Sequence, residues 1–364
     1  MHRNAVADAM LPVGALVAAL LVFGLFVRLG GVSPVETWVL LFKGAFGDWY
    51  SWQNTLTRAA PLMLTALCVA LPARAGLVII GGEGALVLGG LAGAALPGWL
   101  PLPGNAVGTA LLCAAGFAVG AAWIVLAGAL RQYRGVNETI SSLLLAYTAI
   151  ALFKHLVEGP MRDPATLNKP STRTLDEALR IGGIAGSEVH WGFVIGAAAC
   201  IALGWWLTFT ARGFSVRVVG GNARTAQLVG LPASALILLA CALGGGCAGL
   251  AGAIEVAAVH TNANAALIAG YGYAGILVSF IARHNPVAVI PVAILFGGFG
   301  AAGSLLQRRL GLPDASVQVL QGIAFVLILA SEALRGVDWR AAGERFRRSA
   351  VRGDAAPAPS RNPA

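Results

Sequence analysis

Charged side chains are scarce in this chain of 364 residues. Asp, Glu, Lys and Arg make up 11% of it, whereas 57% of the residues are hydrophobic and the mean hydropathy is +0.77. A soluble domain carries about 25% charged residues, so this composition excludes a chain surrounded by water and indicates membrane-spanning helices. The net charge of +9 does not indicate a nucleic-acid partner, because the arginines are spread between apolar segments and gather after Leu334. Such clustering is typical of the cytoplasmic side of a membrane protein.

Lysine is rarer still, and its scarcity excludes a nucleotide-binding loop. The three lysines, Lys43, Lys154 and Lys169, are followed by glycine, histidine and proline. A phosphate-binding loop needs a glycine-rich turn that ends in Lys followed by Ser or Thr. The chain also has no HExxH sequence, no GxSxG sequence and no close Cys–His cluster. We therefore expect no catalytic residue, metal or cofactor on this chain, and any ATP hydrolysis would occur on a separate chain.

Cysteines are few, and their positions exclude a disulfide framework. Each one falls inside an apolar stretch, where burial as a small hydrophobic side chain explains it. We therefore expect neither disulfides nor metal ligands among them. The five are Cys68, Cys113, Cys200, Cys241 and Cys247.

Apolar stretches long enough to cross a bilayer recur along the chain. Since one crossing needs about 20 residues, they predict an all-α, polytopic transmembrane helical bundle of about ten spans. An even number places both termini on one side, and the excess of Lys and Arg in the connections on that side predicts that it is cytoplasmic. Arg308 and Arg309 depart from this charge pattern. The predicted spans are residues 10–28, 53–73, 77–96, 106–130, 138–157, 190–210, 234–257, 268–283, 286–304 and 317–335.

Two connections are long enough to have structure of their own, and they lie on opposite sides of the membrane. The extracytoplasmic loop, residues 158–189, contains the capping-box sequence Thr-Leu-Asp-Glu at 174–177, which predicts a short helix that ends at Gly182 and Gly183. A lid, a docking surface and a plain loop all remain open. The cytoplasmic loop, residues 211–233, is positively charged, which suits docking or simply the charge bias of that side. The membrane domain is predicted over residues 1–335, and 336–364 are expected to be a disordered cytoplasmic tail.

An acidic residue lies within the third predicted span. Glu83 follows Gly81 and Gly82 and precedes Gly84, and this sequence favours an irregular or broken helix. A charge inside the bilayer costs at least about 3 kcal/mol and usually serves a pathway. Two interpretations remain open: the carboxylate faces a water-filled path, or it stabilises helix packing through hydrogen bonds.

A second glycine-rich break, residues 270–275, falls in the other half of the chain. Interrupted helices in two halves are typical of the central binding site of a transporter. Tyr271 and Tyr273 within this break suit stacking on a ring or a place in the aromatic belt at the membrane interface.

Polar residues also mark the beginning of the fifth predicted span. Asn137, Glu138 and Tyr147 form a polar stripe there, although Asn137 also suits an N-cap. The candidates for a substrate pathway are therefore Glu83, Asn137, Glu138, Tyr147, Tyr271 and Tyr273.

Several segments, in their order and spacing, together resemble one protein family. They are residues 75–84, 135–147, 159–164, 213–230, 248–256, 270–273 and 303–307. These segments are similar to the permease subunits of bacterial ATP-binding cassette (ABC) importers for simple sugars and nucleosides, in the superfamily of ribose and branched-chain amino acid permeases. The resemblance covers roughly residues 50–335. The chain lacks the asparagine that the family has near Ile79, and Ala223 stands where proline commonly follows an asparagine.

The resemblance implies a permease that carries a nucleoside or simple sugar across the bacterial inner membrane by alternating access. It also implies a cytoplasmic ATP-binding subunit, a second permease subunit that is identical or related, an extracytoplasmic substrate-binding protein and surrounding membrane lipid. Residues 213–230 correspond to the segment that docks on the ATPase. The predicted coupling residues are Arg217, Gly220, Asn222, Arg224 and Gly230.

Two alternatives to an ABC permease remain open on the residues alone. An ion-coupled secondary transporter of a small polar solute would keep an acidic relay within its spans and would work without ATP. A membrane-embedded enzyme or an assembly scaffold would have to use residues that form no recognisable constellation in this sequence.

Overall fold

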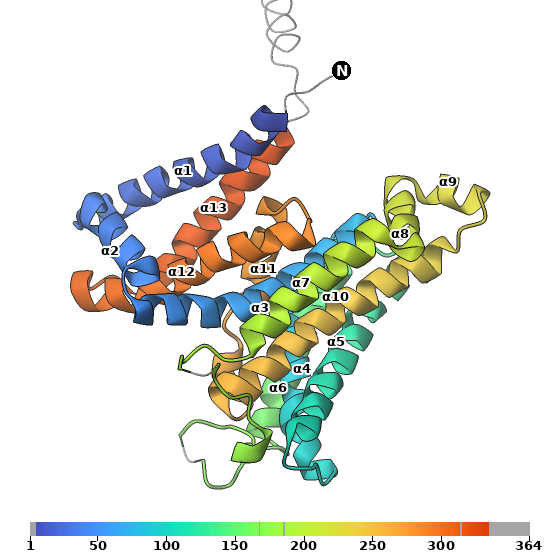
Figure 1. Cartoon of the computed structure of the whole chain (residues 1–364), viewed down its shortest axis with the longest axis horizontal. Coiled ribbons are helices and arrows are strands. Elements are labelled where there is room, and N and C mark those ends of the chain that lie inside the picture. The colour runs from blue at the N-terminus through green and yellow to red at the C-terminus, as the bar shows by residue number, and fades with distance from the viewer. Residues whose placement is uncertain (1–4, 167, 185, 314, 335–364) are drawn as a thin grey trace, which may run out of the picture.

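The computed structural model describes residues 5–334 except 167, 185 and 314, and this part of the chain is a helical bundle (Figure 1). No β-strand occurs within the described residues, which contain only isolated bridges. The predicted tail, residues 336–364, lies outside the described part. The helices are α1 (Ala5–Leu29), α2 (Pro34–Phe46), α3 (Trp49–Arg74), α4 (Gly82–Trp99), α5 (Ala106–Arg134), α6 (Glu138–Glu158), α7 (Gly192–Phe209), α8 (Ala211–Gly221), α9 (Ala223–Leu228), α10 (Ala233–Glu255), α11 (Tyr271–Ile281), α12 (Pro286–Leu310) and α13 (Ala315–Leu334).

Each of the ten predicted spans overlaps one of these helices. Among the described residues, six helices are long and apolar enough to cross a membrane: α3, α5, α6, α7, α12, and α10 together with the π-helical turn that follows it. Three shorter apolar stretches lie at 14–29, 265–281 and 315–331. The all-helical membrane architecture is thus confirmed, while the count of ten crossings stays a prediction.

Helix α2 was not predicted from the sequence. Ser33 accepts a hydrogen bond from the backbone N–H of Glu36, and Pro34 occupies the first helical position, so the start of the helix has ordinary capping chemistry. Glu36 and Lys43 interrupt its apolar residues, so the sequence shows no charge-free stretch of the length of a span there. Its 13 residues are also too few for a crossing.

The centre of the bundle is built by close packing of α4, α5 and α10. Glycines make this approach possible: a Cβ atom added at Gly249 of α10 would collide with the carbonyl oxygen of Gly116 of α5. A Cβ atom at Gly89 of α4 would collide in turn with the backbone of Gly249. Small residues at such contacts let helix backbones approach each other where lipid provides no hydrophobic driving force.

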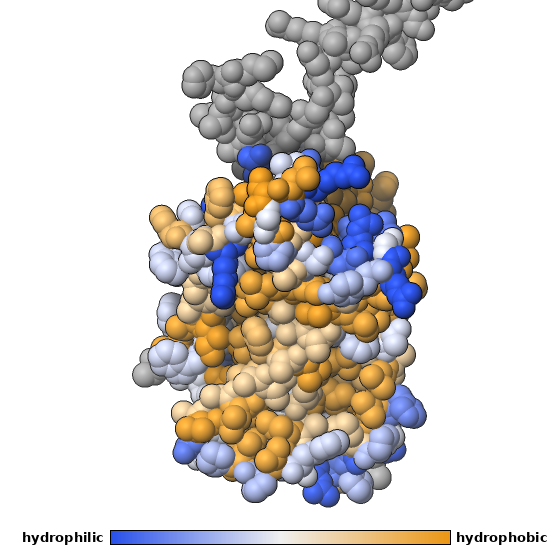
Figure 2. All heavy atoms as spheres, turned by 90° about the vertical axis from the view of Figure 1, so that its right-hand side faces the viewer, coloured by the Kyte–Doolittle hydropathy of each residue, from blue (hydrophilic) through white to orange (hydrophobic). Residues whose placement is uncertain are grey.

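Apolar side chains also cover the outside of the bundle. Figure 2 shows them over the middle of one face, with hydrophilic residues gathered toward its two ends. Leu21 and Leu25 of α1 and Leu144 of α6 are among the large apolar residues that remain exposed. Such a surface requires lipid or another apolar partner, because soluble monomers rarely expose large contiguous apolar patches.

The two ends of the bundle differ. The short helices α8 and α9 project from one end, termed the α9 end, and residues 159–191 cover the opposite end, termed the loop end (Figure 1). The capping-box prediction was wrong in extent. Only a short 3-10 turn, Glu177–Leu179, forms there, and Asp176 at its start makes no side-chain capping bond.

The glycine contacts give a test of the packing. We expect Gly249→Val to lower the free energy of unfolding by about 3 kcal/mol, because the added atoms must displace the backbones of α4 and α5. The measurement is thermal unfolding of the purified protein in detergent. Gly14→Val is the matched control, since nothing lies within 4 Å of a Cβ atom at Gly14. Equal stability of the two variants would contradict the packing account.

Candidate functional site

Helices α4 and α11 begin inside the bundle, not at its ends. Residues 77–81 are not helical and lead into α4. Two side chains of α6 bind the backbone of this segment: the Ser142 hydroxyl accepts from the N–H of Ile80 at 3.1 Å, and Thr139 donates to the carbonyl oxygen of Val78 at 3.0 Å. Irregular backbone at membrane depth needs such internal partners.

The segment before α11 is held from the loop end. Thr172 donates its backbone N–H to the carbonyl oxygen of Ala263 at 3.0 Å, and Leu175 donates likewise to Thr261 at 2.7 Å. Residues 261–270 then lead to Gly270, whose φ of +81° suits glycine, and α11 begins at the next residue. The loop over residues 158–189 is therefore bonded to the segment that leads into α11.

Glu83 connects these two internal helix starts. It lies in the first turn of α4 and is fully buried. Its carboxylate accepts hydrogen bonds from the backbone N–H groups of Gly270 at 2.8 Å and Gly272 at 2.6 Å. These donors stand at the N-terminus of α11, where N–H groups lack helical partners and the helix dipole favours negative charge. Of the two interpretations of Glu83, the structure supports helix packing through hydrogen bonds.

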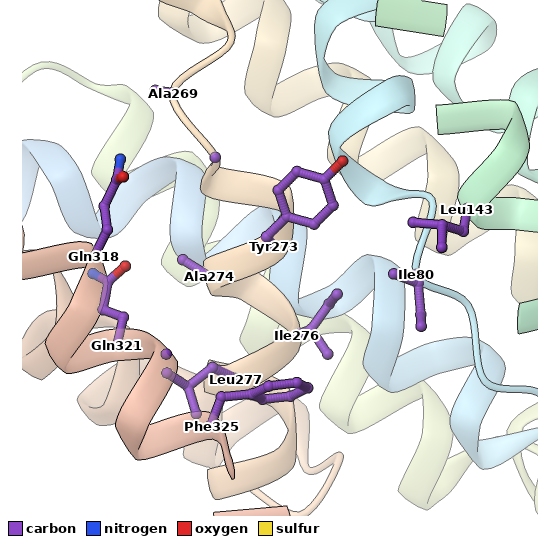
Figure 3. A pocket seen from close by; sticks show the side chains of 12 residues that line it. Ile80, Leu143, Ala269, Tyr273, Ala274, Ile276, Leu277, Gln318, Gln321 and Phe325 are labelled. Carbon is purple, nitrogen blue, oxygen red and sulfur yellow. The ribbon is translucent and has the colours of Figure 1, made fainter. Parts of the chain in front are cut away.

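A cavity of about 440 Å³ lies beside the start of α11. Figure 3 shows Tyr273 of α11 between Leu143 of α6 on one side and Gln318 and Gln321 of α13 on the other. Phe325 lies further along α13 in the same wall. The cavity is largely apolar, with a few polar groups at one side, and this composition is typical of small-molecule sites.

A second cavity, of about 240 Å³, shares part of this lining. Gly270, Gln318 and Gln321 border both spaces, while Arg58 of α3 and Tyr271 of α11 border the second alone. The second space is therefore richer in hydrogen-bonding groups than the first. The N-terminus of α11 lies between an apolar, aromatic compartment and a polar compartment.

The structure brings together only some of the predicted pathway residues. Tyr271 and Tyr273 line the two cavities, and Glu83 holds the backbone next to them. Asn137 instead caps α6, accepting from the N–H groups of residues 139 and 140, and Glu138 lies 3.3 Å from the Arg131 guanidinium of α5. Their contact with a cargo stays a prediction.

Tyr147 lies on α6, near Tyr273 of α11. It is one helical turn from Leu143, which lines the larger cavity, and 58% of its surface is exposed. Its side chain therefore extends the cavity wall toward the outside of α6.

Three polar residues of the cavities were not predicted from the sequence: Arg58, Gln318 and Gln321. The glutamines stand three residues apart in an apolar helix, a spacing that places them on one helical face. That pattern was a usable signal. Arg58 offered none, because an arginine near a predicted span end also suits the interface.

The predicted coupling residues lie at the α9 end. Asn222 accepts a hydrogen bond from the N–H of Thr225 at 3.0 Å and so caps α9, although proline is absent after it. Arg217 and Arg224 are exposed, and Gly230 has a φ of +82° just after α9. Leu228 is 84% exposed, so α9 presents an apolar tip, and the same short helix carries the exposed Arg224.

The capping of α11 generates a prediction for Glu83→Gln. A glutamine keeps one acceptor oxygen but turns an NH2 donor toward a backbone N–H, and charge-assisted bonds are worth about 1.5–3 kcal/mol each. We expect a fall in unfolding free energy of about 2 kcal/mol, measured by thermal unfolding in detergent. Glu188→Gln, on the exposed loop, is the control. Unchanged stability of Glu83→Gln would contradict the capping role.

Comparison with known proteins identifies relatives over most of the chain. Residues 51–329 match the family described as branched-chain amino acid transport system / permease component. The chain is 32% identical to the glucose ABC transporter permease protein TsgB13 of Haloferax volcanii, covering 88% of this chain and 87% of that protein.

Two further relatives show the same type of protein. The guanosine ABC transporter permease protein NupP of Bacillus subtilis is 26% identical, with 90% of this chain and 95% of that protein covered. The nucleoside ABC transporter permease protein NupB of Lactococcus lactis subsp. cremoris is 24% identical, with 87% and 90% covered. The chain therefore belongs to the branched-chain amino acid transport system permease family and is a multi-pass permease subunit of an ABC transporter, as the resemblance predicted.

Proposed function

We propose that this permease moves a nucleoside or simple sugar through the two cavities beside α11, by alternating access that a partner ATPase drives. The observation that carries the proposal is the internal start of α11 between an apolar and a polar compartment. Interrupted helices that border a central cavity are the usual place for a transported solute.

The chemistry of the lining suits this class of cargo. Tyr273 and Phe325 offer aromatic faces in the larger cavity, which a flat ring can contact. Arg58, Gln318 and Gln321 offer hydrogen-bond donors, and the glutamines also offer acceptors, for sugar hydroxyls. A nucleoside uses both compartments, whereas a free sugar uses the polar one. The named functions of the relatives, which include glucose, guanosine and nucleoside transport, agree with this range.

The ion-coupled alternative has no support among these relatives. An ion-coupled transporter would also need an acidic relay along its pathway. The residues that line the two cavities include no carboxylate. Two buried carboxylates, Glu83 and Glu255, lie near Tyr271 but outside these linings. Glu83 already accepts two backbone hydrogen bonds, and Glu255 lies 3.8 Å from the His260 ring.

The proposed orientation places the α9 end in the cytoplasm. Arg74, Arg212, Arg217, Arg224 and Arg283 gather near that end, as the charge bias of cytoplasmic segments requires. Both chain termini then lie in the cytoplasm of a bacterium, and ten helices cross or enter the membrane, with α2 at the loop end. Helix α12 runs toward the loop end, so Arg308 and Arg309 remain extracytoplasmic exceptions.

Three protein partners follow from the proposal. The cytoplasmic ATP-binding subunit docks on α8 and α9, where the apolar tip around Leu228 is exposed. The extracytoplasmic substrate-binding protein docks on the loop end, over residues 158–189. A second permease subunit, identical or related, packs against the face of α6 that exposes Leu144 and Tyr147, and thereby closes the larger cavity from the side.

Uptake by the reconstituted complex tests the proposed function. The chain and its co-purifying partners are placed in liposomes, and uptake of labelled nucleoside and labelled glucose is measured with and without ATP. We expect ATP-dependent uptake of at least one of them, and loss of uptake when Arg217 and Asn222 are both replaced by alanine. Uptake that follows an ion gradient without ATP would contradict the proposal.

Replacement of the cavity glutamines tests the cargo path. We expect Gln318→Leu and Gln321→Leu each to raise the KM for uptake about tenfold, because one lost hydrogen bond is worth about 1–1.5 kcal/mol. Gln307→Leu, at an exposed position of α12, is the matched control. A KM that stays unchanged in both cavity variants would place the cargo elsewhere.

A further inference from the structure

The turn between α11 and α12 has an uncommon backbone conformation. Arg283 and His284 both have a φ of +55°, a backbone conformation that residues other than glycine rarely adopt. Such residues cost about 1–3 kcal/mol each and persist only where surrounding contacts hold them. The turn therefore depends on its neighbours, and it follows the C-terminal end of α11, one helical turn beyond Leu277 of the cavity lining.

Arg74, at the end of α3, binds this turn from a neighbouring helix, while within the turn the N–H of His284 donates to the carbonyl oxygen of Ser279 at 2.8 Å. Its Nε atom donates to the carbonyl oxygen of His284 at 2.8 Å, and its Nη2 atom donates to that of Arg283 at 3.3 Å. The His284 ring lies 2.9 Å from the Ser279 hydroxyl of α11. Burial and the neighbouring Arg74 charge lower the pKa of His284 to about 4, so the ring is neutral at pH 7. One guanidinium thus holds both strained residues.

The backbone of Arg74 also packs directly against helix α8 of the predicted coupling segment. A Cβ atom added at Gly220 of α8 would collide with the carbonyl oxygen of Arg74. Gly76, which has a φ of +85°, also lies against Gly220: a Cβ atom added at Gly76 would be 3.3 Å from the Gly220 carbonyl oxygen. Helix α8 is therefore in direct backbone contact with the end of α3, and a shift of α8 must displace Arg74.

At its other end, α11 is attached to α3 and α4. The Thr65 hydroxyl of α3 lies 3.0 Å from the carbonyl oxygen of Tyr271, and Glu83 of α4 binds the N–H groups of Gly270 and Gly272. The helix has 11 residues, a length of about 16 Å, so its two ends belong to one short rigid element. The turn at 283–284 and the cavity wall at Tyr273 are thus joined by a single short helix.

We propose that Arg74 is the positioning residue that transmits movement of the coupling segment α8–α9 to α11 and so links ATP hydrolysis to movement of the cavity wall. The inference rests on the proposed function, since it assumes a partner ATPase at α9. Beyond that function, the coupling path runs through the Arg74 guanidinium and the turn at residues 283–284. Helix α3 lies between the two moving parts, and Arg74 contacts both of them.

The test is the number of cargo molecules moved per ATP hydrolysed by the reconstituted complex. We expect Arg74→Ala to keep ATP hydrolysis and complex assembly but to lower this ratio at least about tenfold, the factor for one lost charge-assisted hydrogen bond. Arg74→Lys keeps the charge but cannot reach both carbonyl oxygens, and we expect about a threefold fall. Arg134→Ala, at an exposed arginine at the end of α5 and outside the docking helices, is the matched control.

The possible outcomes separate this inference from the proposed function. Absence of ATP-dependent uptake by the wild-type complex would overturn the proposed function. Wild-type uptake together with an unchanged ratio in Arg74→Ala would overturn the coupling role alone. If the complex does not assemble with Arg74→Ala, the Arg74→Lys variant provides the test. A wild-type ratio of cargo moved to ATP hydrolysed in Arg74→Lys would then overturn the inference. A fall in uptake that merely follows a fall in ATP hydrolysis would indicate a structural role and also overturn it.

Discussion

The carboxylate of Glu83 at the N-terminus of α11 is the contact on which the rest of the site depends. An unpaired backbone N–H inside a membrane costs several kcal/mol, so a helix cannot begin there without a partner for its first donors. Glu83 provides two acceptors from the first turn of a neighbouring helix. Because α11 can therefore start inside the bundle, the space above its N-terminus is left free for the two cavities.

The surrounding structure holds this arrangement from three directions. Small residues let α4, α5 and α10 pack closely, which fixes the position of Glu83. Residues of the long loop bind the backbone of the segment that descends to Gly270. At the opposite end, Arg74 holds the turn after α11. The short helix is thus attached to the loop end, to the bundle centre and to the α9 end, which are the three regions that a transport cycle has to connect.

Much of the bundle could be predicted from the sequence, because apolar length is a strong signal for membrane helices. The predicted spans overlap ten helices, while α2, α8 and α9 lie outside them; the charges of α2 interrupt its apolar run. The glycine runs marked the two internal helix starts, although α4 begins at Gly82 and not at residue 77. The sequence could not pair Glu83 with Gly270 and Gly272, because those partners lie 187 and 189 residues away and use backbone N–H groups that leave no sequence signal.

The central claim is that cargo occupies the space beside the N-terminus of α11. An experimental structure of the assembled complex with bound cargo tests it most directly. We expect the cargo to lie between α6, α11 and α13, with polar atoms within hydrogen-bonding distance of Gln318 or Gln321. We also expect Glu83 to remain bonded to Gly270 and Gly272. A cargo bound outside these cavities, or a Glu83 carboxylate turned away from α11 to contact the cargo directly, would contradict it.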